Sequence, residues 1–392
     1  MKVVIAVDSY PPAPGGVASH ARRLGLGLTR LGHEVAIVTA APKDHVGEVD
    51  GLRVVKVRLR LQRLPGAYKD AALPFVPPWS DRSLANALRE ASRSLRADVI
   101  HAHGWSEMAA REVSDDLSIP LVVTLHDYGL VCPQKSHLRG DRVCGHQASA
   151  RCWHCPGSNQ SNVKRVFLAA ALTRYRSRAP SRYIAVSQFV AEHHRKWGYA
   201  ASTIEVIPNF IDYPTATAPR HSQDGHVLFV GPEDPYKGLQ VLRAATEELL
   251  SRGLPVRVCH VGGPAVYSGD GFIGTGRLTG AALSAAYDNA ALLVAPAIYP
   301  DPCPTVILEA MAHSLPVVAS ATGGHADIVT EDTGRLVPVG SSSALANAIE
   351  TLVRDKDLAA KLGRNGREHC RSFSSDVVIP RIIATYAKVV ES

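Results

Sequence analysis

The sequence alternates short, continuous apolar runs with stretches that have helical spacing. In the first half of the chain, the apolar runs are residues 3–7, 35–39, 98–103, 121–126 and 183–187. A strand that is apolar throughout is buried on both faces, which is typical of a parallel sheet covered by helices. The alternation therefore predicts a doubly wound α/β domain.

The same alternation restarts after a polar, proline-bearing stretch at residues 215–225. A chain of 392 residues is too long for one ordinary core. We therefore predict two α/β domains, 1–210 and 211–375, with a cysteine-rich insertion at 130–160. We also expect a C-terminal helix at 376–392; packing of this helix against the first domain is an expectation that the sequence does not establish.

The charge balance is basic, with a formal net charge of +7. Such a chain attracts a phosphate-bearing ligand or an anionic surface. Nucleic acid is not expected, because lysines and arginines are scattered and lack the aromatic neighbours of a stacking platform. The basic stretch at 163–178 is a candidate for peripheral membrane contact, and a solvated helix face is the alternative.

The first residues lack a signal-peptide pattern, and no apolar run reaches the roughly 18 residues of a membrane span. We therefore expect a cytoplasmic protein with contact, if any, at the inner membrane face.

Ligands of open α/β sheets bind beyond the carboxyl ends of the strands. After the first strand, Gly15 and Gly16 precede a helix. Glycines allow close backbone approach, and the free amides at a helix start attract anions. From the residues alone, an anion site and an ordinary turn are equal alternatives.

The stretch YPDPCPTVILEAMA, residues 299–312, carries the most information. A helix is expected to start near Pro304 or Thr305, with the proline at its tolerated first position, so the amides of Thr305 and Val306 would face a diphosphate. Glu309 could accept hydrogen bonds from both hydroxyls of a ribose. The alternative, slightly favoured without family knowledge, is that Glu309 only stabilises the helix start electrostatically.

Two more loops of the second domain suit phosphate. In GPEDPYKGLQVL, residues 231–242, Lys237 precedes a helix and could neutralise phosphate, and TGGHADIV at 322–329 again places glycines before a helix. Asp301, in the loop before Pro304, could accept hydrogen bonds from sugar hydroxyls. Together these loops predict a nucleotide diphosphate ligand.

Taken in order, several motifs resemble the retaining GT-B glycosyltransferases of family 4 over nearly the whole chain. The motifs are PGGV, TLHD, VIPNFID, FVG followed by YKG, GRLTGAALSAAYDNA, and Asp301 with Glu309 eight residues later. The resemblance implies two facing Rossmann-like, doubly wound domains with an interdomain cleft. The second domain would bind a nucleotide-diphosphate sugar such as a UDP-sugar, and the first an acceptor.

The implied reaction is transfer of a hexosyl group, with retention, to a hydroxyl of a small metabolite, glycolipid or polysaccharide. A sugar-nucleotide epimerase on the same scaffold and a non-catalytic metal-binding scaffold stay open as alternatives. An oxidoreductase is disfavoured, because the glycines at 269, 271 and 274 do not follow the first strand and lack an acidic residue about 20 positions later.

The resemblance also assigns roles to residues. It implies catalytic roles for His126 beside the donor sugar, Asp301 on the transferred sugar and Lys237 on the diphosphate. The expected donor contacts are Gly15, Gly16, Gly231, Lys237, Arg277, Asp301, Pro304, Thr305, Val306 and Glu309. His103 is expected on the acceptor side. Without a family context, a packed or capping role is more usual for a histidine at a strand end such as His126.

Two positions depart from the family pattern. Pro232 stands where the family usually has an arginine, and Asp301 stands where it usually has a glutamate. Arg277 is a candidate to supply the missing charge. The family mechanism is a front-face displacement in which a donor phosphate oxygen takes the acceptor proton, so no side-chain base is required. The resembled family also needs no metal on the diphosphate, so no catalytic divalent metal is expected.

Four cysteines lie close together in the insertion. They are Cys132, Cys144, Cys152 and Cys155, in the pattern C-x11-C-x7-C-x2-C. Because cytosolic thiols stay reduced, we expect a structural zinc, with an iron–sulfur cluster or unliganded thiols as alternatives. Four thiolates would staple the insertion over the acceptor, leaving Lys135, His137 and Arg139 free to contact it.

Overall fold

The computed structural model describes residues 1–13, 15–63, 75–140, 142–156, 161–175, 180–214, 225–264 and 271–391. The chain divides into two compact units: unit 1 is Met1–Asn209 with Ser375–Ser392, and unit 2 is Phe210–Ser374. This boundary lies one residue from the one expected after 210. The expected linker falls outside the described residues, apart from residue 225.

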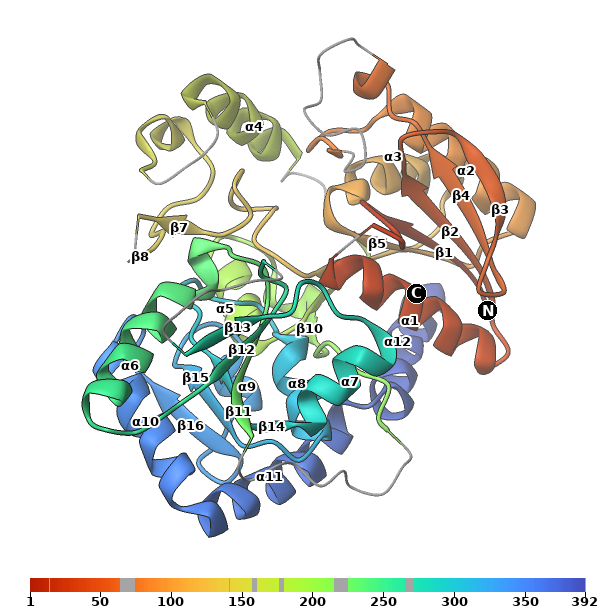
Figure 1. Cartoon of the computed structure of the whole chain (residues 1–392). Helices are drawn as coiled ribbons and strands as arrows, with labels where there is room; N and C mark the ends of the chain where they lie inside the picture. Colours follow the sequence, from red (N-terminus) through yellow and green to blue (C-terminus); the bar gives the residue numbers. More distant parts are fainter. Residues whose placement is uncertain are drawn as a thin grey trace. The chain divides into compact units, whose positions relative to one another are not determined.

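Unit 1 is built on a sheet of the order β10-β9-β6-β5-β1-β2-β4-β3 (Figure 1). Its strands are β1 (Lys2–Val7), β2 (Glu34–Ala40), β3 (His45–Val49), β4 (Leu52–Val57), β5 (Val99–His103), β6 (Leu121–Leu125), β9 (Arg182–Ala185) and β10 (Ile204–Val206). The paired strands are parallel except β3, which runs antiparallel to β4. Val3 lies between Val35 and Val99 in this register and is fully buried, as its apolar run predicts.

Helices cover this sheet. They are α1 (Gly16–Arg30), α2 (Arg82–Leu95), α3 (Glu107–Leu117), α4 (Asn162–Tyr175), α5 (Gln188–Lys196) and α12 (Ser375–Val390), with short 3-10 turns η1 (Leu61–Arg63), η2 (Gly104–Ser106) and η4 (Ala201–Thr203). The start of α2 is fixed by Asp81, which accepts hydrogen bonds from the amides of Ser83 and Leu84. The described helices include none that is long and apolar enough to cross a membrane.

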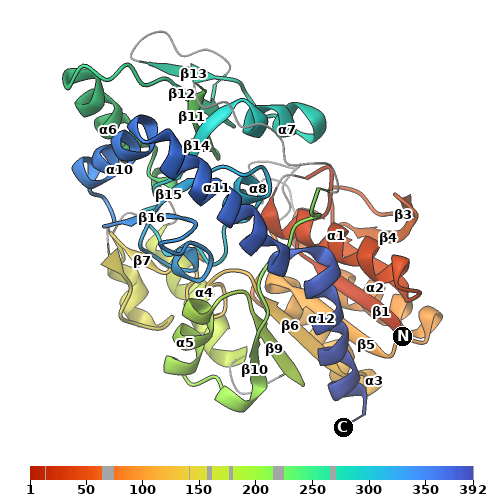
Figure 2. The same ribbon diagram turned by 90° about the horizontal axis from the view of Figure 1, so that it is seen from below.

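The C-terminal helix α12 lies beside α1 in unit 1 (Figure 2). A side chain at Gly27 of α1 would meet the end of the Ile379 side chain of α12, so the absence of a side chain there favours this close approach. Further along α12, the Tyr386 hydroxyl lies 2.7 Å from Nδ1 of His101 in β5. The last helix therefore packs on the first domain's core.

The cysteine-rich insertion lies between β6 and α4. Its regular structure consists of the two-residue strands β7 (Leu138–Arg139) and β8 (Arg142–Val143), which pair antiparallel, and a 3-10 turn, η3 (Ala150–His154). Cys152 lies within η3, and the other three cysteines lie in the connections around these elements.

Unit 2 contains a fully parallel sheet of the order β13-β12-β11-β14-β15-β16. Its strands are β11 (His226–Val230), β12 (Val258–Val261), β13 (Phe272–Gly274), β14 (Ala290–Ala295), β15 (Val317–Ser320) and β16 (Gly334–Val337). The helices are α6 (Leu239–Ser251), α7 (Gly280–Asp288), α8 (Thr305–Ala312), α9 (His325–Ile328), α10 (Ser342–Arg354) and α11 (Lys356–Cys370), with the turns η5 (Pro235–Lys237) and η6 (Arg371–Phe373).

In both units the strand order reverses at the first strand. In unit 1, β1 lies between β2 and β5; in unit 2, β11 lies between β12 and β14. Ligands of open α/β sheets bind at such a switch point, outside the carboxyl ends of the strands. The candidate sites are therefore the loops after β1 and β5, and those after β11 and β14.

Candidate active site

In unit 2, the loop after β11 holds Lys237 in a fixed place. Asp234 caps η5 by accepting a hydrogen bond of 2.9 Å from the Tyr236 amide. Gly238 follows with φ of +76°, and a side chain there would overlap the carbonyl of Pro296, the residue after β14. Lys237 is thus carried from β11 toward the end of β14.

Lys237 meets Asp301 from the loop after β14. The Lys237 ammonium donates to Asp301 Oδ2 at 2.7 Å and to the Tyr299 hydroxyl at 3.2 Å. The Asp301 side chain is only 9% exposed, whereas that of Lys237 is 32% exposed. Burial alone would raise the pKa of Asp301, but the charges of Lys237 and His325, with hydrogen bonds from Lys237 and Tyr299, together hold the pKa below its ordinary value. Asp301 is therefore a buried, ionised acceptor.

The glycine pair of the TGGH loop supports Asp301. Gly324 donates its amide to the Asp301 carbonyl at 2.8 Å. Gly323 has φ of +55°, and a Cβ there would lie 2.6 Å from the Asp301 nitrogen. Only glycine allows this approach, so two of the loops expected to suit phosphate meet at Asp301.

Helix α8 begins at Thr305, one of the two starting positions that the sequence allowed. Pro304 is the residue that precedes the helix, with φ of −74°, and Thr305 is the first helical residue. The expectation of Pro304 inside the first turn is therefore wrong. The reason is local, since Pro304 has ψ of 106°, an extended value outside the helical range. The first amides of α8, at Thr305 and Val306, have no acceptor within the helix.

Glu309 is held by a residue that the sequence did not single out. Its Oε2 accepts a hydrogen bond of 2.9 Å from the hydroxyl of Tyr287 in α7. The Tyr287 ring is buried and stacks on His313, with centroids 5.2 Å apart. Glu309 therefore has a positioning partner beyond the helix to which it belongs.

The other predicted donor residues are spread more widely. Gly231 directly follows β11 and accepts a hydrogen bond of 2.8 Å from the His260 ring on its carbonyl. Arg277 follows β13 and is exposed, and the described structure does not bring it into contact with Lys237 or Asp301. Of the dinucleotide-like glycines, Gly269 lies outside the described residues, and Gly274 ends strand β13 without opening a helix.

In unit 1, the residue after β1 is a second organising carboxylate. Asp8 accepts hydrogen bonds from the amides of Trp105 and Ser106, at 3.1 and 2.7 Å, in the turn after β5. A Cβ at Gly104, which has φ of +76°, would lie 2.5 Å from the Asp8 carboxylate. Asp8 thereby joins the carboxyl ends of the two strands at the switch point.

Three histidines gather at the same edge. Nδ1 of His103, which ends β5, lies 2.9 Å from Nε2 of His126, which follows β6. The ring of His20, from α1, lies 4.6 Å from that of His126 between centroids. The three residues offer nitrogen atoms that all lie within 4.8 Å of one another.

These rings are neutral at physiological pH. Burial lowers the pKa of His126 to about 3, and the opposing effects of the Asn209 hydrogen bond and the Asp8 charge do not compensate. Burial also lowers the pKa of His20 and His103 well below the ordinary value. Each ring can then donate through one nitrogen and accept through the other.

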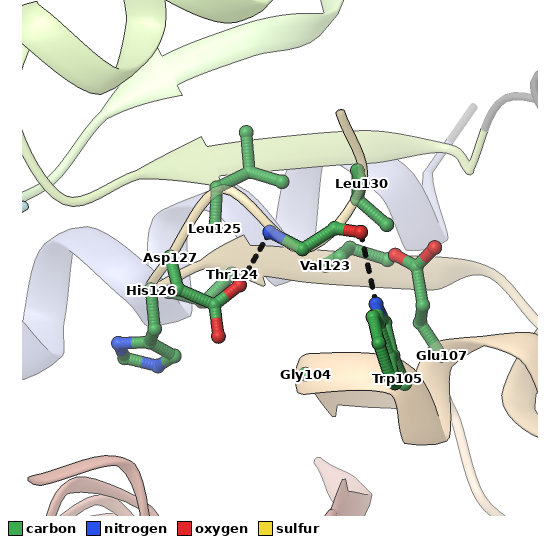
Figure 3. Close-up of a pocket in the computed structure, with 10 residues that line it drawn as sticks. Gly104, Trp105, Glu107, Val123, Thr124, Leu125, His126, Asp127 and Leu130 are labelled. Carbon is green, nitrogen blue, oxygen red and sulfur yellow. Dashed lines mark hydrogen bonds between the residues drawn. The ribbon is translucent and has the colours of Figure 1, made fainter. Parts of the chain in front are cut away.

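Figure 3 shows a small pocket lined by residues of β6 and residues that follow β5 and β6, of which His126 is the one member of the histidine group. The Trp105 indole donates to the Gly129 carbonyl at 2.9 Å, and the Gly129 amide donates to Asp127 at 2.7 Å. The pocket volume is about 10 Å³. That is the size a single water needs, so this pocket is part of the support of the site and no substrate chamber.

The three predicted acceptor residues of the insertion lie in different environments. Lys135 is not free: its ammonium lies 3.1 Å from Asp8 and 3.6 Å from Asp127. His137 is fully buried and stacks on Tyr128, so the expectation that it contacts the acceptor from the surface is wrong. The ring packs against His193 and Trp197 as well as Tyr128. Arg139 is exposed.

Gly15 and Gly16 start α1, as expected. Gly15 has φ of +142°, a conformation that side-chain-bearing residues rarely adopt, and Gly16 is the first residue of the helix. No polar side chain caps this helix start. Its first amides therefore have neither an acceptor within the helix nor a side-chain cap.

Sequence reasoning missed His20, Asp8, Tyr287 and Tyr299. Asp8 carried a signal, because it directly ends the first apolar run. The other three carried none, because His20 and Tyr287 lie within helices and Tyr299 is a loop aromatic.

Two Rossmann-like units on parallel sheets define the GT-B architecture of glycosyltransferases. The model of Glycosyltransferase Family 4 matches residues 14–213, and that of Glycosyl transferases group 1 matches residues 224–355. The chain belongs to glycosyltransferase family 4, and it is an enzyme that uses a nucleotide sugar. A retaining mechanism is consistent with this family.

Curated relatives match over almost the whole chain. D-inositol 3-phosphate glycosyltransferase of Corynebacterium efficiens is 27% identical, covering 95% of this chain and 90% of the relative. Phosphatidyl-myo-inositol mannosyltransferase of Mycolicibacterium smegmatis is also 27% identical, covering 96% of this chain and 91% of the relative. These relatives favour a transferase over the epimerase and the non-catalytic scaffold.

Solved structures share the fold. Sucrose-phosphate synthase of Thermosynechococcus elongatus superposes with a TM-score of 0.71 at 23% identity, with 98% of each chain covered. HepE of Anabaena, solved in complex with UDP, gives a TM-score of 0.66 at 20% identity, covering 99% of this chain and 100% of that one.

Proposed function

We propose that this glycosyltransferase transfers a hexosyl group, with retention, from a UDP-sugar bound at the β11–β14 edge of unit 2 to an acceptor hydroxyl. The acceptor binds at the edge of unit 1 that carries His103 and His126. The observation that carries the proposal is the contact between Lys237 and Asp301, which joins the two loops at the topological switch point.

The Lys237 ammonium can serve the donor without leaving Asp301. It has three N–H donors, and Asp301 and Tyr299 take two of them. The third can donate to a diphosphate oxygen, while the first amides of α8 bind the same group. Asp301 keeps a second carboxylate oxygen for a sugar hydroxyl, and Glu309, oriented by Tyr287, accepts from the ribose hydroxyls.

In the proposed reaction, the acceptor oxygen attacks the anomeric carbon from the side of the leaving group. The bond from that carbon to the phosphate oxygen breaks, and the acceptor proton passes to a phosphate oxygen of the departing nucleoside diphosphate. Lys237 and the α8 amides stabilise the charge that develops there. His126, held neutral, is a hydrogen-bonding partner for the sugar; protonation plays no part.

Pro232 removes the arginine expected after β11, so the diphosphate charge needs a further partner. Arg277 is our candidate, since it is exposed and its side chain can reorient on donor binding. A catalytic divalent metal is not part of the proposal.

The choice of UDP and of a hydroxyl-rich acceptor rests on the relatives. HepE of Anabaena was solved with UDP-glucose as well as UDP, although at 19% identity this likeness shows the fold alone. Two relatives carry inositol in their names. A polyhydroxylated acceptor, free or on a lipid, fits both, and the basic charge of the chain favours a phosphorylated one.

For a lipid-borne acceptor, α4 is the proposed membrane contact, which places the enzyme at the cytoplasmic face of the inner membrane. Val163 and Phe167 of α4 are 67% and 60% exposed. Lys164 and Arg174 are exposed on the same helix. Apolar side chains with basic neighbours suit an anionic interface. Sedimentation with anionic and neutral vesicles tests this, and equal absence from both pellets would contradict it.

A thermal-shift screen with UDP-, GDP-, ADP- and dTDP-hexoses tests the donor assignment. A ligand that binds the folded state alone raises its stability. We expect UDP-hexose to raise the unfolding temperature, and we expect Glu309→Gln to abolish this shift. Glu350→Gln in α10, which removes a carboxylate that pairs with Arg252 and Arg354, is the control and should preserve the shift. A shift with another nucleotide alone would overturn the choice of UDP, and no shift with any would overturn the donor site.

A further inference from the structure

The cysteine-rich insertion has too little internal structure to hold itself in place. Between β6 and α4, its regular elements are a ladder of two residues per strand and one 3-10 turn. Two-stranded ladders of this size are unstable alone, and such segments depend on a disulfide or a metal. All four cysteines of the insertion are free thiols.

These four residues form what we call the cysteine quartet: Cys132, Cys144, Cys152 and Cys155. Cys132 is buried at the start of the insertion, Cys144 directly follows β8, and Cys152 and Cys155 lie in and after η3. The thiols of Cys144 and Cys152 are near enough to both Cys132 and Cys155 to influence their ionisation. Residues from three separate turns thus gather in one place.

Hydrogen-bond donors contact the sulfur atoms of Cys132 and Cys155. The backbone amides of Gln134 and His137 hydrogen-bond to the Cys132 sulfur, and Gln134 Nε2 donates to the Cys155 sulfur at 3.0 Å. Metal-bound thiolates need such donors, and these partners orient the ligands.

A buried arginine, Arg165, lies close to the quartet. The Arg165 guanidinium donates at 3.0 Å to the carbonyl of Cys152 and also at 3.0 Å to that of Trp153. Arg165 is only 3% exposed, and its charge acts on the Cys155 sulfur. Four thiolates on one divalent ion carry a net charge of about −2, which a nearby guanidinium offsets.

We propose that the cysteine quartet binds one structural Zn²⁺ that staples the insertion to unit 1. Four thiolates complete the tetrahedral shell of zinc and leave no open position, so the ion does not take part in the chemistry. In the described residues, the ligand atoms of the three histidines lie within 4.8 Å of one another, whereas the sulfur atoms of the quartet do not form such a group. Binding therefore requires rotation of cysteine side chains, for which the two-residue strands leave the backbone free.

Zinc binding by the quartet would also fix the position of Lys135, which bears on the proposed function. The Lys135 amide donates to the Cys132 carbonyl at 3.0 Å, and its carbonyl accepts from Tyr128. From there its ammonium reaches Asp8 and Asp127, at the carboxyl ends of β1 and β6. The zinc thus anchors Lys135 beside His126. This consequence rests on the acceptor site proposed above, whereas zinc binding itself does not.

Metal analysis of the full chain, purified without chelators or nickel resin, tests the proposal. We expect about one zinc per chain. Cys144→Ser and Cys155→Ser should lose nearly all of it, while Cys259→Ala in β12 and His20→Asn should keep it. His20→Asn is included because the histidine group is the competing metal site.

The outcomes are decisive in both directions. Zinc-free wild-type protein, iron in place of zinc, zinc retained by both serine variants, or zinc lost with His20→Asn would each overturn the proposal. A UDP-hexose thermal shift in the serine variants shows that unit 2 still folds. Loss of zinc with that shift intact supports the staple, and loss of the shift in zinc-loaded wild type would instead overturn the donor site.

Discussion

The Lys237 ammonium lies 2.7 Å from a carboxylate oxygen of Asp301, and the two residues come from loops after different strands, β11 and β14. Each loop is fixed on its own. Asp234 caps the turn that carries Lys237, and Gly323 and Gly324 pack closely against the backbone of Asp301. The pair is therefore assembled before any ligand arrives. Preorganised charge of this kind lowers the cost of stabilising a leaving diphosphate.

Lys237→Met should destabilise the enzyme more than Lys237→Met combined with Asp301→Asn. The single change leaves a buried carboxylate without its cation, which costs about 1–3 kcal/mol, whereas the double variant removes the stranded charge. Urea unfolding of the two single variants and the double variant gives the coupling energy. Additive effects would contradict the pairing.

Tyr287→Phe should weaken binding of the UDP-sugar by about tenfold without unfolding unit 2. The variant keeps the buried ring stacked on His313 and removes the hydrogen bond to Glu309, worth about 1–1.5 kcal/mol. Calorimetric titration measures the change. Tyr287→Phe in a Glu309→Gln background is the control, and a further tenfold loss there would show that Tyr287 acts through another group.

Acid should destabilise unit 1 well above the pH at which carboxylates titrate. Burial lowers the pKa of His101 and His126 to about 3 and that of His194 to about 4. Below the ordinary histidine pKa of about 6.5 the unfolded chain binds protons that the folded one does not, so stability is lost as pH falls from there. At pH 5 the loss is about 2 kcal/mol for each histidine.

Denaturant unfolding between pH 7.5 and 5 tests this dependence. His194→Asn should show a shallower slope than wild type, because one of the buried rings no longer titrates. Equal stability at both pH values would contradict the neutral, buried state of these histidines.

Tyr386→Phe should cost about 1–2 kcal/mol of stability, because Nδ1 of buried His101 loses its partner. The ring still fills its site, so packing of α12 persists. Thermal unfolding measures the change, with Tyr213→Phe in unit 2 as a control outside this contact. A variant as stable as wild type would mean that α12 is held by apolar contacts alone.

The sequence predicted the class of fold because apolar runs such as 3–7 and 291–296 are dictated locally by burial on both faces. It also located Lys237, Asp301 and Glu309, since each follows a strand end that those runs define. Contacts between distant segments had no such local signal. His101 meets Tyr386 across 285 positions, and no pattern in either segment predicts the contact.

In the insertion, the sequence predicted a local pattern but not the environment of its side chains. Its cysteine spacing predicted a cluster, but the fate of neighbouring side chains depended on tertiary packing. Lys135 and His137 were both expected to be free to contact the acceptor, yet Lys135 pairs with Asp8 and His137 is buried against Tyr128. Both have positive φ, with values of 62° and 53°, a backbone conformation that these residue types adopt rarely and that propensity does not predict.

Calorimetric titration of UDP-hexose into wild type, Lys237→Met and Lys361→Met tests the central claim most directly. Lys361 is an exposed lysine of α11 and matches the change in charge. The account predicts that Lys237→Met weakens binding by about 10- to 100-fold, as expected for a lost hydrogen bond to a charged group, and that Lys361→Met leaves it unchanged. Equal affinity of all three proteins would show that the diphosphate binds elsewhere.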